Sequence, residues 1–587
     1  MISVVLLCLF FSIRTTFSAS NPSRHCRCLP HDRCWPSDQD WNAFNRSING
    51  NLIHLRPAGA VCHGDEYDEA ACANAQANTL NSYWRAAEPG ALQTPNWEST
   101  GEGVTDCDIT SSRDASCNQG RIPLYAVLAE TAQEIQAAVR FAKRRNLRVA
   151  IKNTGHGGLG VSAAPDSLQI NLGRFKQIET VDEFVPAKGR RSVGRAVTIG
   201  AGVVIRELAQ AGAEEKFTSI MGICDTIGVA GGYIQGGGMG LLASAFGLGS
   251  DNAIEFNVVT ANGDLVVANA YQNNDLFWAL RGGGGGTFGI AVNTTVRALP
   301  DLRGNVLRID AAVNQGKNAG LDPRSVIFDI SREIVSHFPD LKRGDISGTT
   351  SGYVLASIQP NGTFIQSEIV FPNVDSLPLA QTQQIDRLTT AIESLGYGAV
   401  FTANLTAYPH LSAFFRAVQP VPPYGRIEGS VLISEKLYHT PAGADRILDT
   451  IFAPTQRYGH GTTIELFMTG GGQIRSNRDK IDSAISPKWR DVGLYLSARQ
   501  AVPSSNAQKR FRPNSPMTAL RAIEQPGLGS YVNVADWDEP NWKERFWGGN
   551  YDGLYRVKKK YDPEGLFVVN LGVGSDEWDE EKICRVR

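Results

Sequence analysis

The most informative parts of this chain are Gly155-His156-Gly157-Gly158-Leu159-Gly160 and Met221-Gly222-Ile223-Cys224-Asp225-Thr226-Ile227-Gly228. Each places one nucleophilic side chain, His156 or Cys224, in backbone that carries little side-chain bulk. A further glycine run, Gly236-Gly237-Gly238-Met239-Gly240, follows the cysteine. Glycine is favoured where another group must approach the main chain closely. The pattern therefore predicts a large planar cofactor that lies against main chain and is also bonded to the protein.

The first stretch follows a strand–helix–strand pattern. Leu124–Leu128 has the composition of a strand. Thr131 and Glu134 have the spacing of a capping box and open a helix with one apolar face. Arg148–Ile151 is the next expected strand, and it leads directly into the His156 loop.

The His156 loop formally satisfies the G-x-G-x-x-G pattern of nicotinamide-binding folds. That site also needs a helix directly after the glycines, so that the helix N-terminus meets the pyrophosphate. Pro165 and the residues before it are a poor helix start, and we therefore reject a nicotinamide site. A turn whose backbone amides face phosphate oxygens remains, with a tight loop and an exposed histidine as the alternative.

Cys224 and a later glycine run each have a simpler interpretation. A free cysteine is most often a small buried hydrophobic residue. Five consecutive glycines, Gly282 to Gly286, follow the expected short helix Asp275–Arg281, and they could form a flexible turn. We interpret this run as another close backbone approach, because its flanks are regular.

The composition limits the class of protein. Hydrophobic residues make up 42% of the 587 residues and charged residues 20%, as in globular proteins. The formal net charge is −2 with no long basic run, which argues against nucleic acid as a partner. No stretch has about 18 consecutive apolar residues, so no membrane span is expected. No metal site is predicted either.

The cysteines and the N-terminus indicate export. Val4–Phe11 is an apolar run followed by small residues, as in a secretory signal. Of ten cysteines, Cys8 belongs to that signal, and eight of the other nine could form four disulfides whose pairing the sequence leaves open. Cys224 is then the odd cysteine. Four glycosylation sequons agree with this route: Asn45, Asn293, Asn361 and Asn404.

The pattern divides the chain into five parts. We expect a signal peptide at 1–19, a disulfide-rich segment at 20–117, a cofactor-binding domain at 118–302, a substrate domain at 303–520 and a returning C-terminal segment at 521–587. The substrate domain alternates strands such as Thr350–Ile358 and Thr462–Met468 with helices such as Gln383–Leu395.

Several motifs in this order resemble one known family. They are Gly155-His156-Gly157, Gly222-Ile223-Cys224-Asp225-Thr226-Ile227-Gly228, Gly236-Gly237-Gly238, Asp275-Leu276-Phe277-Trp278-Ala279-Leu280-Arg281-Gly282-Gly283 and Lys559-Lys560-Tyr561-Asp562-Pro563. The chain resembles the berberine bridge enzyme-like branch of the vanillyl-alcohol oxidase flavoproteins over residues 26 to 578. Its Cys26–Pro36 stretch is similar to the secreted fungal subgroup often labelled isoamyl alcohol oxidase-like.

The resemblance implies an α+β fold with a FAD-binding domain and a substrate domain built on an antiparallel sheet flanked by helices. It implies bicovalent FAD, with His156 bonded to the 8α-methyl carbon and Cys224 to C6 of the flavin. The residues expected to contact the cofactor are Lys152, Asn153, Thr154, Gly155, His156, Gly157, Gly158, Cys224, Gly228, Gly232, Gly236, Gly237, Gly238 and Asn550. Lys152 stands where the family commonly has arginine, and Met239 where related fungal chains often have histidine.

Oxidation of a C–H bond beside oxygen or nitrogen also needs a base. Tyr551, in a stretch that resembles the family's C-terminal flavin-contacting motif, is the first candidate, and Glu465 is the second. Tyr531, Asn533, Asn550 and Glu428 are further candidates.

The sequence thus predicts a secreted, glycosylated FAD-linked oxidase. Its substrate would be a small alcohol, a sugar hydroxyl or a secondary-metabolite intermediate, and molecular oxygen would be the acceptor. Two alternatives remain open: a FAD-dependent dehydrogenase with another acceptor, and a non-catalytic secreted glycoprotein.

Overall fold

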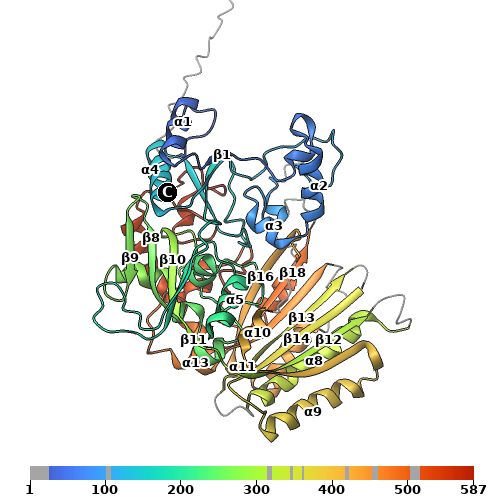
Figure 1. Ribbon diagram of the computed structural model, residues 1–587. Helices are drawn as coiled ribbons and strands as arrows, with labels where there is room; N and C mark the ends of the chain where they lie inside the picture. Colours follow the sequence, from blue (N-terminus) through green and yellow to red (C-terminus); the bar gives the residue numbers. More distant parts are fainter. Residues whose placement is uncertain are drawn as a thin grey trace, which may run out of the picture.

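Three larger sheets and their helices make up the protein (Figure 1). The computed structural model describes residues 26–100, 107–313, 320–343, 348–359, 362–416, 422–452, 461–502 and 516–586. The predicted signal peptide at 1–19 and the sequon at Asn361 lie outside these ranges. No helix in the described ranges is both long enough and apolar enough to cross a bilayer.

The first sheet has four strands in the order β1-β2-β4-β3. Its elements are β1 (Leu52–His54), β2 (Tyr125–Leu128), α4 (Ala132–Arg145), β3 (Arg148–Lys152) and β4 (Ser167–Asn171). Strand β4 pairs in parallel with both β2 and β3, and α4 connects β2 to β3. Thr131 and Glu134 form both hydrogen bonds of the predicted capping box. No helix separates the His156 loop from β4, as expected when the nicotinamide site was rejected.

The second sheet is antiparallel, with five strands in the order β5-β6-β10-β8-β9. Its strands are β5 (Ile178–Val181), β6 (Ala196–Gly200), β8 (Ala253–Val259), β9 (Leu265–Asn269) and β10 (Ile290–Arg297). Around them lie α5 (Ile205–Glu215), α6 (Ala243–Phe246), α7 (Asn274–Leu280) and a small pair of strands, β7 (Phe217–Thr218) and β11 (Leu299–Pro300). The His156 loop connects β3 to β4 of the first sheet, and the Cys224 loop lies between β7 and β8.

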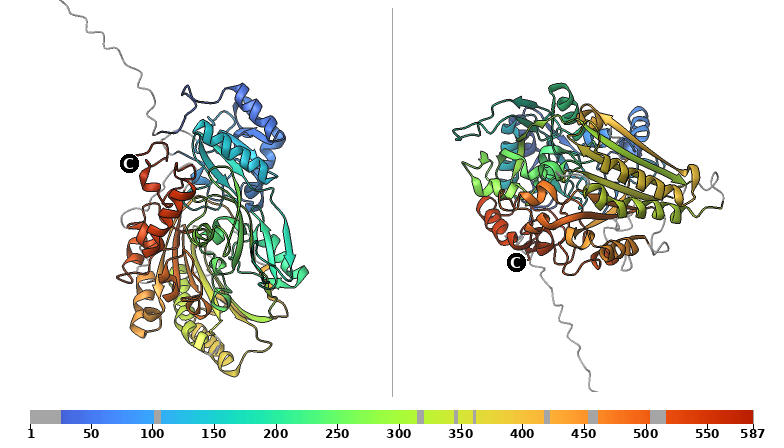
Figure 2. Two further views of the ribbon diagram at one scale, coloured as in Figure 1. Left: turned by 90° about the vertical axis from the view of Figure 1, so that its left-hand side faces the viewer. Right: turned by 90° about the horizontal axis from the view of Figure 1, so that it is seen from below.

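The third sheet has seven antiparallel strands in the order β15-β12-β14-β13-β17-β18-β16. The strands are β12 (Gly304–Val313), β13 (Ser351–Gln359), β14 (Gly362–Pro372), β15 (Phe401–Tyr408), β16 (Arg426–Ser434), β17 (Thr462–Met468) and β18 (Val492–Ala501). Its helices are α8 (Pro323–Arg343), α9 (Leu379–Ser394), α10 (Leu411–Arg416), α11 (Glu435–Tyr438), α12 (Pro441–Phe452), α13 (Gly472–Ser476) and α14 (Pro516–Arg521). Figures 1 and 2 show α8 and α9 on one face of this sheet.

Alternation along β13 separates the two faces of the seven-stranded sheet. Val354, Ala356 and Ile358 pack with the apolar residues of α8 in a buried core. Leu355 and Ser357, which point the other way, line the large cavity of the molecule. The sheet therefore has one structural face and one face available to a ligand.

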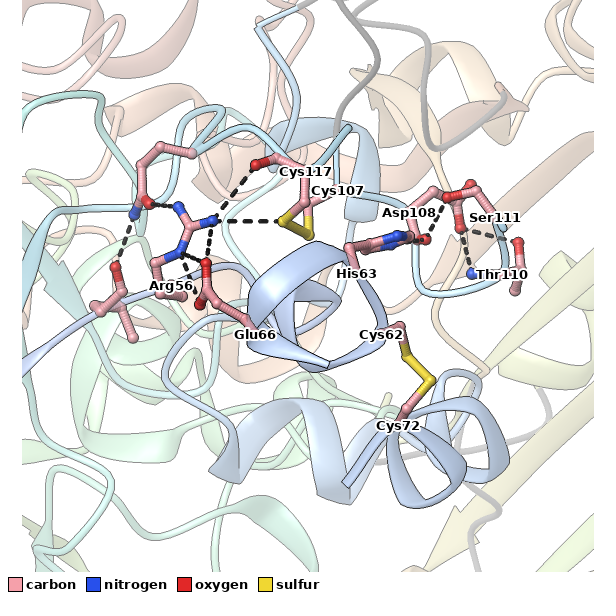
Figure 3. Close-up of a disulfide and its surroundings, with 12 residues drawn as sticks. Arg56, Cys62, His63, Glu66, Cys72, Cys107, Asp108, Thr110, Ser111 and Cys117 are labelled. Atoms are coloured by element: carbon pink, nitrogen blue, oxygen red, sulfur yellow. Dashed lines mark hydrogen bonds and ion pairs between the residues drawn. A yellow bond between two sulfur atoms is a disulfide. The ribbon is translucent and has the colours of Figure 1, made fainter. Parts of the chain in front are cut away.

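The N-terminal segment is tied together by disulfides (Figure 3). It contains α1 (Asp38–Ser47), α2 (Glu69–Asn78) and α3 (Ser82–Ala87). Cys62 bonds to Cys72, and Cys107 bonds to Cys117. Beside them, Arg56 pairs with Glu66 at 2.7 Å. These links stabilise a region that has only a small apolar cluster of its own.

The C-terminal segment returns to the first sheet through α15 (Trp542–Trp547) and α16 (Tyr551–Tyr561). Cys26 bonds to Cys584, which ties the N-terminal segment to the chain end beside α4 (Figure 1). Cys28 bonds to Cys34. The prediction of four disulfides with Cys224 left over is therefore confirmed for the described residues. The predicted α+β architecture with a large antiparallel sheet is also confirmed, whereas the five domain boundaries stay predictions.

Candidate functional site

A cavity of about 720 Å³ lies between the glycine-rich loops, the C-terminal segment and the open face of the seven-stranded sheet. Its walls include the His156 loop, the Cys224 loop, Gly284 to Gly286, residues 531–534 and residues 569–572. Cavities of this size hold cofactors and drug-sized ligands. Parts of the chain that are far apart in sequence therefore build one site.

His156 faces this cavity with one ring nitrogen engaged. Its Nε2 atom lies 2.8 Å from Oγ1 of Thr226. Burial, with a contribution from the cations Arg426 and Arg499, lowers the pKa of His156 to about 3. The imidazole is therefore neutral at physiological pH and keeps a lone pair for bonding.

Cys224 lines the same cavity and contacts the same threonine. Its Sγ atom lies 3.8 Å from Oγ1 of Thr226, and burial raises the pKa of the thiol. The two loops are also joined through Thr154, whose Oγ1 accepts the Gly228 N–H at 3.2 Å. The structure thus brings the two predicted attachment residues together on one wall.

The glycines of two separate runs form a bare backbone surface. A Cβ atom on Gly285 would lie 2.8 Å from the Cα atom of Gly232, so the two runs are in contact. A Cβ atom on Gly231 would lie 2.4 Å from the Asn153 amide nitrogen. A Cβ atom on Gly232 itself would meet no atom within 4 Å, because this glycine faces open space in the cavity. Main chain is therefore exposed to a ligand there.

Most of the predicted contact residues line the cavity. They are Asn153, Thr154, Gly155, His156, Gly157, Gly158, Cys224, Gly228 and Gly232, together with Tyr531, Asn533, Glu428 and Glu465. Met239 lines it as well.

Lys152, which was expected to contact the cofactor, points away from the cavity. Its side chain is fully buried, and Nζ donates to the backbone carbonyls of Arg85, Ala86 and Glu88 at 3.3, 3.3 and 2.6 Å. These carbonyls end α3, where a helix leaves acceptors without partners. Lys152 thus caps the C-terminal end of α3, and its ammonium group interacts with that helix end.

The last glycines of the motif also pack within the protein. Gly236 lies under the Asn533 amide, and a Cβ atom there would sit 2.2 Å from Oδ1. A Cβ atom on Gly238 would lie 2.9 Å from the Cα atom of Gly249. Gly237 has φ +126° and lies beneath the ring of Tyr531. These three glycines, which were expected to contact the cofactor, contact parts of the protein that surround the cavity and do not line the cavity themselves.

Tyr551 and Asn550 likewise lie outside the lining. The hydroxyl of Tyr551 donates to Asp576 at 3.4 Å and accepts the Gly574 N–H at 3.2 Å. Asn550 donates to the Ile485 carbonyl at 2.8 Å. The first candidate for the base is therefore placed in the packing of the C-terminal segment, and the second, Glu465, is in the cavity.

Two buried carboxylates and two guanidinium groups line the side of the cavity that the seven-stranded sheet forms. Arg499 donates to Oε2 of Glu428 at 3.1 Å and to Oε1 of Glu465. Arg426 donates to Glu428 at 3.0 Å. Burial raises the pKa of Glu428, but the two cations outweigh this effect and hold it below its usual range. A Cβ atom on Gly158 would lie 2.0 Å from Glu428, so this carboxylate also touches the His156 loop.

Several residues that line the cavity were not predicted from the sequence. Among them are Arg426, Arg499, Tyr495, Tyr424 and Thr226. Arg426 and Glu428 are spaced by two residues on β16, and Tyr495 and Arg499 by four on β18. This alternation of polar and aromatic residues on one strand face is the signal that could have found them.

Comparison with known proteins identifies the family. Residues 123–269 match the FAD binding domain family, and residues 530–574 match the family described as berberine and berberine like. A flavin-dependent oxygenase, ucdF, from Aspergillus ustus is 45% identical over 93% of this chain and 98% of its own length. An FAD-linked oxidoreductase, malF, from Malbranchea aurantiaca is 37% identical over 95% of this chain and 94% of its own length. The chain belongs to the berberine bridge enzyme-like FAD-linked oxidoreductases.

Solved structures share the architecture of this FAD-linked oxidoreductase. A VAO-type flavoprotein from Myceliophthora thermophila has a TM-score of 0.78 at 28% identity and covers 96% of this chain and all of its own. The berberine bridge enzyme from Eschscholzia californica, at 17% identity and a TM-score of 0.63, shares the fold over 91% of this chain and 98% of its own.

The cavity of this oxidoreductase suits FAD. Bare backbone at Gly232 leaves room for a group against the main chain. The Nδ2 donor of Asn570 and the Oε1 acceptor of Gln235 are buried and have no hydrogen-bond partner within the described ranges. Both residues line the cavity, and buried polar atoms normally have partners. A ligand with both donors and acceptors, such as a flavin nucleotide, would satisfy them.

Proposed function

We propose that this oxidoreductase is a secreted oxidase whose FAD is bonded to both His156 and Cys224. It takes a hydride from a small alcohol, a sugar hydroxyl or a secondary-metabolite intermediate, and molecular oxygen is the final acceptor. The observation that carries the proposal is the shared contact of His156 and Cys224 with Thr226 on one cavity wall. FAD, when bound, supplies the electron-accepting ring.

Thr226 also selects the ring nitrogen of His156 that can bond to the cofactor. Because Nε2 is engaged with Oγ1 of Thr226, Nδ1 is the nitrogen left for attachment. Each attachment replaces a C–H hydrogen of the cofactor and an N–H or S–H hydrogen of the protein with a new bond. Each is therefore a two-electron oxidation, for which we name molecular oxygen as the oxidant.

Glu465 is the proposed base on the substrate side. Its Oε2 accepts from Ser497 at 3.1 Å and its Oε1 from Arg499, so its orientation in the cavity is fixed. Glu428 holds two guanidinium groups, and its low pKa makes it a weak base. We therefore assign proton removal from the substrate heteroatom to Glu465. Glu428 is assigned to holding Arg499 in place.

Export and glycosylation are part of the proposal. Four disulfides suit an oxidising compartment. Asn404 lies exposed on β15, where a glycan can be attached.

The test has two steps on the purified protein. Acid precipitation is expected to leave the yellow colour with the polypeptide, whereas release of the colour into the supernatant would contradict attachment. A substrate screen that follows peroxide release is then expected to find a substrate consumed with equal amounts of oxygen. Reduction of an artificial dye without oxygen consumption would instead show a dehydrogenase.

A further inference from the structure

Helix α3 belongs to the disulfide-rich N-terminal segment, yet it contacts the Cys224 loop and the strand β3 that leads into the His156 loop. Its C-terminal carbonyls accept from Lys152, which lies four residues before His156. Its residue Tyr83 reaches the other loop, where its hydroxyl donates to Oδ2 of Asp225, the neighbour of Cys224. One short helix therefore links the two attachment residues to the same scaffold (α3, Figure 1).

Asp225 is the point at which this scaffold meets the Cys224 loop. Its side chain is 1% exposed, and a carboxylate so deeply buried needs compensating partners. Arg206 supplies the charge, with Nη2 at 2.9 Å and Nε at 3.1 Å from the same Oδ2 atom. The guanidinium also donates to the Tyr83 hydroxyl. The result is a cluster of three side chains, Tyr83, Arg206 and Asp225, in which each contacts the other two.

The same cluster fixes the backbone beside Cys224. The Arg206 N–H donates to the Asp225 carbonyl at 3.0 Å, and the Ile205 N–H donates to the Ile227 carbonyl at 3.0 Å. The loop is therefore held against the start of α5 by backbone bonds and against α3 by the Tyr83 hydroxyl.

The His156 loop also has contacts that lie outside the cluster around Asp225. The Gln93 N–H donates to the Gly155 carbonyl at 3.2 Å, and Nε1 of Trp97 donates to the Gly158 carbonyl at 2.8 Å. None of these atoms belongs to the cluster around Asp225. Loss of the contact between Tyr83 and Asp225 therefore leaves these two contacts of the His156 loop in place.

We infer that the contact between Tyr83 and Asp225 positions Cys224 for its bond to the flavin, and that the bond at His156 forms without this contact. The inference rests on the proposed bicovalent attachment. Tyr83 and Asp225 are positioning residues, since they act through the loop and not on the reacting atoms. Bond formation depends steeply on alignment, and a misplacement of about 1 Å can slow a reaction about 100-fold.

The experiment compares the wild type with Tyr83→Phe and Asp225→Asn after tryptic digestion. Trypsin separates the two attachment residues, because cleavage at Lys152 and Arg174 frees residues 153–174, and cleavage at Lys216 and Arg281 frees residues 217–281. We expect both variants to carry FAD on peptide 153–174 while peptide 217–281 is mostly free, with attachment at Cys224 slowed about tenfold to 100-fold. The absorption spectrum should match that of Cys224→Ala.

Control variants separate this effect from general damage. Tyr67→Phe removes a hydroxyl from the same N-terminal segment, and Asp65→Asn removes an exposed carboxylate there; both should retain full attachment. Tyr83→Phe keeps the ring that Arg206 faces at 5.8 Å, so this variant is expected to fold. Full attachment at Cys224 in both Tyr83→Phe and Asp225→Asn would overturn the inference alone. A wild-type protein without flavin on Cys224 would overturn the proposed function as well.

Discussion

Nε2 of His156 lies 2.8 Å from Oγ1 of Thr226, and the same oxygen lies 3.8 Å from Sγ of Cys224. A single hydroxyl therefore contacts both of the residues that we assign to flavin attachment. It fixes the orientation of the ring and lies close enough to the sulfur to influence its proton.

Replacement of Thr226 by valine should impair both attachments. Valine keeps the shape but lacks the hydroxyl, so both His156 and Cys224 lose a polar partner. We expect flavin attachment to be slowed at both peptides, by about tenfold for a loss near 1.4 kcal/mol. Mass analysis of the digested protein measures this effect. Thr226→Ser keeps the hydroxyl and should retain attachment, and an unaffected Thr226→Val variant would argue against the role.

Replacement of Glu465 by glutamine should impair turnover and leave the flavin attached. Loss of a positioned base reduces rates by about 100-fold to 10,000-fold. The rate of flavin reduction by a substrate found in the screen, followed by stopped-flow absorbance, gives the size of the effect. Glu368→Gln is the matched control, because Glu368 is buried on β14 of the same sheet and does not line the cavity. Equal rates in Glu465→Gln and the wild type would exclude Glu465 as the base.

Lys152 should make stability depend on pH in a defined window. Burial lowers its pKa from 10.5 to about 8, although Glu88 and Glu98 oppose the shift. Between these values the unfolded chain binds more protons than the folded one, so the free energy of unfolding rises with pH. The wild type should therefore gain stability relative to Lys152→Met from about pH 8 to 10.5, by on the order of 3 kcal/mol.

Denaturant unfolding at several pH values measures that difference. Lys176→Met, at an exposed lysine that pairs with Glu207, serves as the control. A constant difference between the wild type and Lys152→Met across the window would contradict the assignment of Lys152 as a buried helix cap.

The bond between Cys26 and Cys584 should contribute more stability than the bond between Cys28 and Cys34. The first closes a loop with a sequence separation of 558, and the second closes one of 6. Chain entropy then predicts a loss of about 6 kcal/mol when the first pair is replaced by alanine and about 2 kcal/mol for the second. Equilibrium unfolding of the two double variants gives both values, and an equal loss for both pairs would contradict the expectation.

The local elements of the cofactor-binding half could be predicted from the sequence. Two examples are the cap at Thr131 and the strand predicted at Arg148–Ile151, which the structure extends by one residue to Lys152. Cysteine parity also left Cys224 unpaired, as the structure has it. Each of these inferences needed only a short stretch of chain or a count.

The substrate side could not be predicted in this way. Glu465 and Arg499 meet because β17 and β18 pair in one register, with Glu465 opposite Ser497, and no local pattern fixes that register. The direction of the Lys152 side chain could not be predicted for the same reason. A lysine beside a glycine loop is suited to phosphate, but the carbonyls of α3 come from a segment about 65 residues earlier. Tyr551 lies outside the cavity lining because α16 turns it toward Asp576.

Tryptic digestion of the wild-type protein followed by mass spectrometry tests the central claim most directly. Two bonds to one FAD predict a single species in which peptides 153–174 and 217–281 are joined through the dinucleotide. Recovery of both peptides free of added mass would contradict the account.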